Sequence, residues 1–299
     1  MSKSNRQELL TGLLFISPWI IGFIAFQLFP FVQSLYYSLT DFNLIKTPRF
    51  VGLNNYIELF TRDRNFSLSL SNTLYMTVIG IPVQLMFAFV CALLLNQRFR
   101  GQAIVRTIYI IPTVMPAVAV SILWLWITNP QIGLINSLLR NIGIEGPIWF
   151  RDPVWSKPTL ILMLCWTVGS TIIIYLAGLQ EVPRELYESA EIEGANSLQQ
   201  LRHITWPLLS PVTLFNLITG LIWSFQMFTE GFLISGGAGG LGQPQGSMLF
   251  YSLYLWQNAF SYTRMGKASA MAWILFVLIL VVTIITLRLS RRTTHYEVR

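Results

Sequence analysis

The spacing of charged residues constrains the fold of this chain more than any other feature. Only 11% of its residues are charged, against about 25% in ordinary soluble domains. Seven charge-free windows separate the charges, and each can hold the roughly 20 residues that cross a bilayer. The windows are residues 9–40, 65–97, 107–139, 158–180, 203–229, 231–263 and 268–287. The chain is therefore predicted to be an all-α membrane protein.

One window is not expected to cross the membrane. Residues 231–263 contain the run GGAGGLGQPQG, which would expose unsatisfied backbone groups to lipid if it were a spanning helix. The run lacks the Lys-Ser or Lys-Thr ending of a phosphate-binding loop, so a flexible outer loop is expected there and the whole segment is predicted to be re-entrant or interfacial. Six transmembrane helices remain in a single domain over residues 1–299, at about 10–32, 73–95, 108–127, 158–179, 208–228 and 268–287.

Cationic residues predict the orientation of these spans. Lys and Arg concentrate in short segments on the cytoplasmic side of membrane proteins. In this chain they gather at the start, between the second and third predicted spans, and after the last one: Lys3, Arg6, Arg98, Arg100, Arg106, Arg288, Arg291 and Arg292. We therefore expect both the N- and the C-terminus in the cytoplasm.

The sequence offers no catalytic or metal-binding set. Cys91 and Cys165 both lie in apolar windows and are predicted to be small buried residues. The two histidines have neither a nucleophile nor metal-ligand spacing beside them. We expect no enzyme activity, no bound metal and no cofactor in this chain.

The longest polar stretch between membrane-length windows covers residues 181–211. Good helix formers fill 184–193, and Gly194 follows where a helix commonly ends in a left-handed residue. Asn196 or Ser197 can cap a second helix that re-enters the membrane. The stretch is predicted to be a stiff, bent pair of helices that projects from the bilayer.

This stretch resembles the EAA signature of binding-protein-dependent ABC importer permeases. The matching residues are Glu188-Ser189-Ala190, Glu193-Gly194-Ala195, Ile204, Pro207 and Pro211, with no gap in their spacing. Ser189 and Glu193 stand where the family more often has another small residue and an Asp. The resemblance implies that residues 181–206 form a cytoplasmic coupling helix between spans four and five, which docks on an ATPase subunit through Glu188, Ala190, Glu193, Gly194, Ala195 and Pro207.

A second resemblance concerns the amphipathic run FVGLNNYIELF at residues 50–60, expected to lie along the outer surface. It is similar to a segment of the sugar-transporting, maltose- and glycerol-phosphate-permease-like branch of the family. That branch implies carriage of a sugar, polyol or glycoside across the cytoplasmic (inner) membrane by alternating access. The implied partners are a second, related permease in a heterodimer, two ATPase subunits that hold ATP and Mg, and an extracytoplasmic solute-binding protein. A nucleic-acid partner is not expected.

Polar and aromatic residues near the outer end of the fifth predicted span are candidates for the substrate path. Polar groups at membrane depth are costly, so a carboxylate with polar neighbours there suggests a function. The candidates are Trp223, Ser224, Gln226, Glu230 and Tyr254. Two simpler interpretations stay open: Glu230 lies among the outer headgroups, and Tyr254 belongs to an interfacial aromatic belt.

Two alternatives to sugar import also stay open. The same importer architecture could carry a glycerol-phosphate ester, an amino acid or another osmolyte. A secondary transporter would work without ATP and needs a charged coupling-ion site at the midplane, which the charge-free windows disfavour.

Overall fold

The computed structural model describes residues 3–45, 47–97, 99–240 and 242–290. Apart from one isolated antiparallel bridge between Thr40 and Phe50, regular secondary structure in these ranges is helical. The all-α class predicted from the sequence is confirmed. Three cations used to predict the orientation, Arg98, Arg291 and Arg292, lie outside the described residues.

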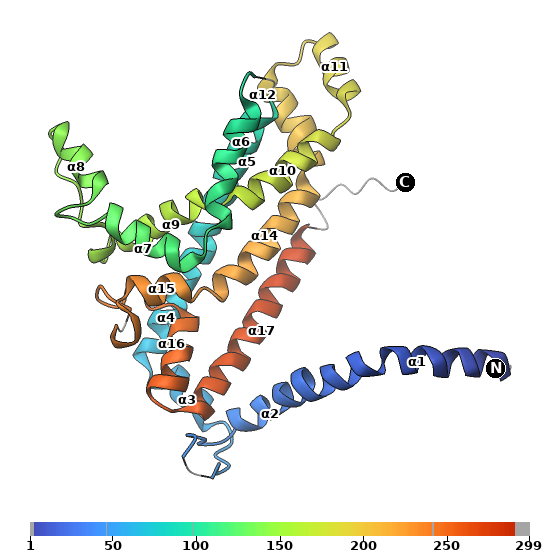
Figure 1. Ribbon diagram of the computed structural model, residues 1–299, viewed down its shortest axis with the longest axis vertical. Helices are drawn as coiled ribbons and strands as arrows, with labels where there is room; N and C mark the ends of the chain where they lie inside the picture. Colours follow the sequence, from blue (N-terminus) through green and yellow to red (C-terminus); the bar gives the residue numbers. More distant parts are fainter. Residues whose placement is uncertain (1–2, 46, 98, 241, 291–299) are drawn as a thin grey trace. The chain divides into compact units, whose positions relative to one another are not determined.

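Figure 1 shows the helices in chain order. The first nine are α1 (Lys3–Phe23), α2 (Phe29–Ser38), α3 (Asn54–Thr61), α4 (Arg64–Tyr75), α5 (Ile81–Asn96), α6 (Gln102–Val114), α7 (Ala117–Ile127), α8 (Leu134–Asn141) and α9 (Ser156–Trp166). They are followed by α10 (Gly169–Glu181), α11 (Arg184–Ile192), α12 (Ser197–Gln200), α13 (Trp206–Leu208), α14 (Ser210–Phe225), α15 (Thr229–Ile234), α16 (Tyr251–Trp256) and α17 (Met265–Ser290). Shorter π-helical and 3-10 segments connect several of them.

Three continuous helices are long and apolar enough to cross a membrane: Thr11–Ser38, Arg64–Asn96 and Met265–Ser290. Three more candidate spans are bent pairs. These are α6 with α7, bent by 103°, α9 with α10, bent by 52°, and the helical run Ser197–Leu208 with α14, bent by 63°. The described chain therefore has between three and six candidate spans, depending on whether each bent pair crosses once.

Proline explains several of these irregularities. Three π-helical segments, Ile24–Leu28, Met76–Gly80 and Leu201–Thr205, each end two residues before a proline, at Pro30, Pro82 and Pro207. Because proline has no N–H and its ring crowds the carbonyl four residues earlier, a wider π turn accommodates it without ending the helix.

A proline also marks the sharpest bend. Met115 is extended, with φ −74° and ψ 136°, and Pro116 precedes the first residue of α7. The residue before a proline is driven out of the helical region by steric conflict. This is why the third predicted span is a broken pair rather than one straight helix.

The chain forms two compact units, residues 1–63 with 255–275 and residues 64–254 with 276–299. In the first unit, α3 forms within the amphipathic run predicted from the sequence. Asn55 on α3 donates two hydrogen bonds of 2.8 Å, to the carbonyl oxygens of Ser38 and Thr40. These bonds fix α3 to the end of α2.

A buried ion cluster also stabilises the first unit. The Nζ of Lys267 lies 2.8 Å from Oε1 of Glu58 and 2.7 Å from Oδ2 of Asp63. Lys267 is only 5% exposed. Removing one partner of such a buried pair commonly costs about 3–5 kcal/mol, because the other charge stays buried without compensation.

In the second unit, α10 packs against α5, α6 and α14. Phe89 of α5 and Tyr175 of α10 meet edge to face in one core cluster. Both cysteines are free and buried, as predicted, Cys91 in this cluster and Cys165 in a second one. The approach of α10 to α14 depends on Gly178. A Cβ there would lie 2.8 Å from the side chain of Leu209 and 2.9 Å from that of Val212.

The glycine-rich run after α15 is tied to α4 at its C-terminal end. Nδ2 of Asn72 on α4 donates to the carbonyl oxygens of Gly246, at 2.7 Å, and Leu249, at 3.0 Å. Leu249 and Phe250 are 1% and 0% exposed. The run itself keeps exposed residues at Gly236, Ala238, Gly239, Gln243 and Gln245, so the expected flexible outer loop stays a prediction, and only Gly246 at its end is held by a side chain of α4.

Candidate functional site

The 181–206 loop consists of two short helical arms joined at a glycine. α11 ends at Ile192, and Gly194 follows with φ +81°. The N–H of Gly194 donates to the carbonyl of Glu191 at 3.0 Å, and the N–H of Ala195 donates to that of Ala190 at 2.8 Å. These bonds satisfy carbonyls that the helix end would leave unpaired. The left-handed glycine predicted from the sequence is confirmed.

The second arm begins at a reciprocal cap. Oδ1 of Asn196 accepts the N–H of Gln199 at 2.9 Å, and Oε1 of Gln199 accepts the N–H of Asn196 at 2.8 Å. Of the two caps left open by the sequence, the structure has Asn196. The hydroxyl groups of Tyr187 and Thr205 lie 2.9 Å apart and hold the arms together.

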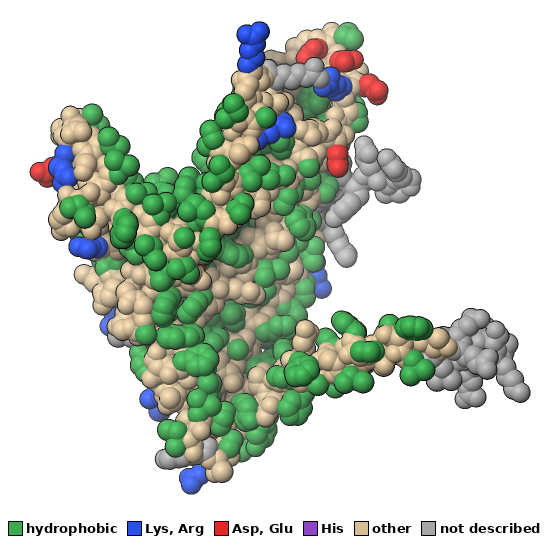
Figure 2. Space-filling view, viewed as in Figure 1, with side chains coloured by type: hydrophobic (Ala, Val, Ile, Leu, Met, Phe, Trp, Pro, Cys, Tyr) green, Lys and Arg blue, Asp and Glu red, His purple; other side chains and the backbone are tan. Residues whose placement is uncertain are grey.

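The outer surface of this loop combines carboxylates with apolar side chains. Glu185, Glu188, Glu191 and Glu193 are all exposed, and Figure 2 shows acidic side chains gathered over α11. Beside them, Ile192 is 88% exposed and Leu198 on the second arm is 72% exposed. Exposed apolar side chains among charges are typical of a protein-docking surface. Glu188, Ala190, Glu193, Gly194 and Ala195 all lie on this loop, and Pro207 lies in α13 just after it.

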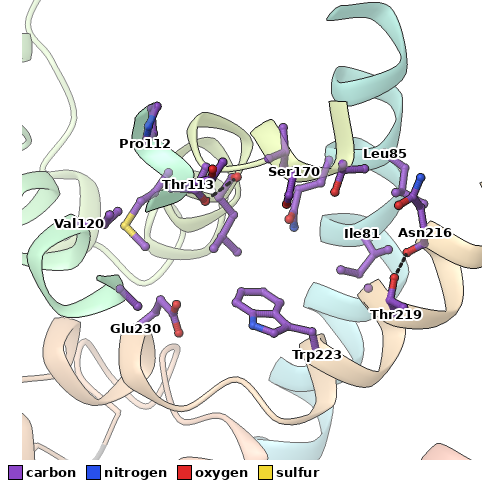
Figure 3. A pocket seen from close by; sticks show the side chains of 18 of the residues that line it. Ile81, Leu85, Pro112, Thr113, Val120, Ser170, Asn216, Thr219, Trp223 and Glu230 are labelled. Atoms are coloured by element: carbon purple, nitrogen blue, oxygen red, sulfur yellow. Dashed lines mark hydrogen bonds between the residues drawn. The ribbon is translucent and has the colours of Figure 1, made fainter. Parts of the chain in front are cut away.

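A cavity of about 460 Å³ lies among the helices of the second unit. On α14, three of its lining residues, Asn216, Thr219 and Trp223, follow a spacing of three and four residues. That spacing places them on one face of a helix. Figure 3 shows Trp223 between Glu230 and the pair formed by Asn216 and Thr219. The other walls come from α5, α6, α7, α9, α10 and α15.

The polar groups of the cavity are mostly hydroxyls and amides. Thr113, Ser170, Thr171 and Gln84 face it from α6, α10 and α5, and Glu230 on α15 is its carboxylate. Within the described ranges, no group of three or more His, Cys, Asp and Glu residues could hold a metal ion. The arrangement suits reversible binding of a polar molecule through hydrogen bonds.

Only two of the five residues predicted for the substrate path line the cavity. Trp223 and Glu230 line the cavity, whereas Ser224, Gln226 and Tyr254 do not. Ser224 is buried, with its Oγ 3.0 Å from Oγ1 of Thr77. Gln226 is exposed at the end of α14, and Tyr254 is buried on α16.

Sequence reasoning missed Asn216 and Thr219. Their signal was present, since both stand at helical spacing from Trp223 in a charge-free window. The lining residues of α5, α6 and α10 carry no such signal, because they meet only after the helices pack.

With this geometry in view, residues 84–295 match the family described as the inner membrane component of binding-protein-dependent transport systems. The chain belongs to this permease family. The resemblance inferred from the 181–211 stretch is thereby confirmed.

Curated relatives cover nearly the whole permease. It is 41% identical over 298 residues to the probable ABC transporter permease protein YesP of Bacillus subtilis, covering 99% of this chain and 95% of the relative. It is 34% identical to the lactose transport system permease protein LacF of Rhizobium radiobacter, covering 96% of each.

The fold also matches a solved transporter. A chain of the bacterial alginate ABC transporter, crystallised in complex with an alginate pentasaccharide-bound periplasmic protein, aligns with a TM-score of 0.83. The two chains are 25% identical, and the alignment covers 98% of each.

Proposed function

We propose that this permease is the transmembrane subunit of an ATP-driven importer that carries a sugar, or a related polyol or glycoside, across the cytoplasmic membrane by alternating access. The observation that carries the proposal is the cavity: hydroxyl, amide and indole groups line it among helices of a permease. Such groups bind a polyhydroxylated molecule without a strong charge. Relatives named for lactose and arabinooligosaccharide transport support this cargo class.

The proposed topology has six spans in one domain. Each bent helix pair crosses the membrane once, and residues 231–263 stay on the outer side. An even number of crossings then separates the 181–206 loop from each terminus, so all three lie on one side of the membrane, which we propose is the cytoplasm. Arg100, in the short connection between α5 and α6, and Arg106, near the start of α6, agree with this orientation.

In this topology the 181–206 loop is the contact with the ATPase subunits. Its exposed carboxylates and the exposed Ile192 offer charge and apolar contact on a stiff support. Two ATPase subunits would hold ATP and Mg, so this chain needs neither cofactor and performs no hydrolysis itself. A second, related permease and an extracytoplasmic solute-binding protein complete the proposed complex.

The connection between loop and cavity suggests how ATP drives transport. The helical run from Ser197 to Leu208 leads directly into α14, which carries Asn216 and Trp223. Displacement of the loop by the closing ATPase pair would tilt α14 and open the cavity outward. ATP and the loaded binding protein act on this equilibrium through their preference for the outward-facing state.

Uptake of labelled sugars into proteoliposomes that contain the complete complex tests the proposal. Uptake should require ATP, and Gly194→Val should reduce it by about 10-fold or more, since a β-branched residue at φ +81° is strained by about 1–3 kcal/mol. Gly143→Val is the matched control. Gly143 has φ +78° and, like Gly194, nothing within 4 Å of an added Cβ, but it lies outside the loop.

The outcomes separate three mechanisms. Loss of uptake and of binding-protein-stimulated ATPase activity in Gly194→Val alone, with the subunits still assembled, supports coupling through the loop. Equal loss in both variants assigns the effect to folding and contradicts it. Uptake without ATP points to a secondary transporter, and ATP-dependent uptake of only amino acids or phosphate esters overturns the sugar cargo.

A further inference from the structure

A groove separate from the cavity lies between α5, α6 and α10 in the second unit. Its volume is about 280 Å³, and it shares no lining residue with the cavity. Leu95, Ile172 and Leu176 form its buried apolar floor, whereas Ile173 and Ala177 are exposed beside it. The groove therefore opens at the surface of α10, and binding of cargo in the cavity does not account for it.

The groove is polar at one end. Arg106 lies in the second turn of α6, and Ile110 follows it one turn farther along. Gln180 is the next-to-last residue of α10, whereas Ile173 lies about two turns before it. Figure 1 shows the start of α6 and the end of α10 on the same side of this unit as α11 and α12. The polar side chains therefore stand toward the 181–206 loop, and the apolar ones lie farther from it.

Arg106 has no counter-charge. It forms no ion pair with any residue that the structure describes, and the described lining of the groove contains no Asp or Glu. Its Nη2 donates to the carbonyl oxygen of Leu95 at 3.2 Å, but Nε2 of Gln102 already donates to the same oxygen at 2.6 Å. Its Nε is buried and has no partner within the described ranges. Most donors of this guanidinium are therefore available to an anionic ligand.

The two ends of the groove decide which anion fits it. A free phosphate ion gains nothing from an apolar floor, whereas an amphipathic molecule is bound at both ends. The groove also lies between helices of three candidate membrane spans, where the surrounding solvent is lipid. Basic pockets between membrane helices at the cytoplasmic side bind the headgroups of anionic lipids. An anionic phospholipid therefore fits better than a soluble anion.

We propose that this groove binds an anionic phospholipid from the leaflet that faces the 181–206 loop. Arg106 and the amide of Gln180 donate hydrogen bonds to the phosphate, and the start of an acyl chain packs along Ile110, Ile173 and Ala177. This inference rests on the proposed function, because that function places α6 and α10 in the membrane. It adds a lipid partner at α10, the helix that leads into the loop.

Photocrosslinking of the complete complex in nanodiscs tests the groove. The two probes are phosphatidylglycerol and phosphatidylcholine with the same photoreactive acyl chain, so they differ in headgroup charge. Mass spectrometry of the labelled peptides should find the phosphatidylglycerol probe on α6 and α10 about 5-fold more often, as expected for one cation near the lipid surface. Arg106→Gln should reduce this preference to about 2-fold or less. Arg100→Gln is the matched control, since Arg100 is exposed before α6 and does not line the groove.

A second pair of variants keeps Arg106 in place. Ala177→Trp fills the apolar part of the groove and should lower labelling of α10 by the phosphatidylglycerol probe about 5-fold. Ala103→Trp is its control, because Ala103 is exposed on α6 outside the groove. If Arg106→Gln does not assemble, because its bond to Leu95 is lost, this pair still tests the site.

Three results overturn the inference. They are equal labelling by the two probes in the wild type, a preference that Arg106→Gln and Ala177→Trp leave unchanged, and no labelling of the groove in the assembled complex, which would mean that another subunit covers it. Displacement of the probe by inorganic phosphate, but not by potassium chloride of equal ionic strength, would assign Arg106 to a free anion and also overturn it.

Sugar uptake by the same complex in proteoliposomes keeps the two proposals apart. ATP-dependent uptake without preferential labelling leaves the proposed function standing and removes the lipid site. Preferential labelling without ATP-dependent sugar uptake supports the lipid site and removes the proposed function.

Discussion

The 181–206 loop and the cavity are built in opposite ways. Hydrogen bonds that shape the loop join residues close in sequence, such as Ala190 with Ala195 and Asn196 with Gln199. The cavity collects side chains from Ile81 to Glu230 on seven α-helices. The shape of the loop therefore depends on its own residues. The cavity, in contrast, forms only when the helices pack together. Substitutions in the loop should therefore change coupling to ATP, and those in the cavity should change the response to cargo.

The largest effect is expected at Gly178, where α10 meets α14. A substitution there should affect the loop and the cavity together. Gly178→Val should clash with Leu209 and Val212 and cost about 1–3 kcal/mol. Because α14 links the loop to the cavity, sugar uptake and stimulated ATPase activity should fall together. Thermal unfolding of the complex in nanodiscs and both activities are the measurements.

Gly22→Val is the control for this substitution. Gly22 is also a helical glycine, and an added Cβ there would have nothing within 4 Å. If Gly178→Val retains both activities, or if Gly22→Val loses as much, close packing between α10 and α14 is not what joins the two regions.

An intermediate effect is expected at Trp223, within the cavity. Trp223→Ala removes the apolar surface offered to a sugar ring and should raise the half-saturating sugar concentration by about 10-fold, with Trp223→Phe in between. ATPase activity stimulated by saturating cargo should stay near wild type. Uptake and ATPase activity measured against sugar concentration test this prediction. If the variant loses stimulated ATPase activity at saturating sugar, the cavity and the loop do not act independently.

The smallest effect is expected at Asn196, within the loop. Asn196→Ala removes one half of the reciprocal cap with Gln199 and should cost about 1 kcal/mol of local helix stability. Uptake at saturating sugar should fall a few-fold, while the half-saturating concentration stays unchanged. Asn196→Ser, which can still cap, should restore uptake, and a shifted sugar dependence would show that the loop also shapes the cavity.

The same contrast explains what the sequence could predict. Gly194 and Asn196 act on their immediate neighbours, so the bent form of the loop was predictable from residue type alone. Pro116 is also a local signal for a break, but residues 108–127 were predicted to form a single span, and neither the break nor its angle was foreseen. The break between α9 and α10 at Thr167 and Val168 has only Gly169 beside it, and a single glycine does not predict a bend of 52°.

The sequence did not predict contacts between residues that lie far apart in the chain. The spacing of Asn216, Thr219 and Trp223 was visible, but the direction of that face depends on how α5 and α10 pack against α14. The anchoring of the glycine-rich run by Asn72 joins positions 174 and 177 residues apart. No local pattern indicates such a pair.

The ion cluster around Lys267 has a consequence for biogenesis. Glu58 leaves the ribosome early, but Lys267 follows it by 209 residues. Until the last helix is synthesised and inserted, the carboxylates of Glu58 and Asp63 have no Lys267 to neutralise them. A chain truncated before α17 should therefore remain incompletely folded and be recognised by membrane quality control. The first unit can be completed only after translation has reached the last helix.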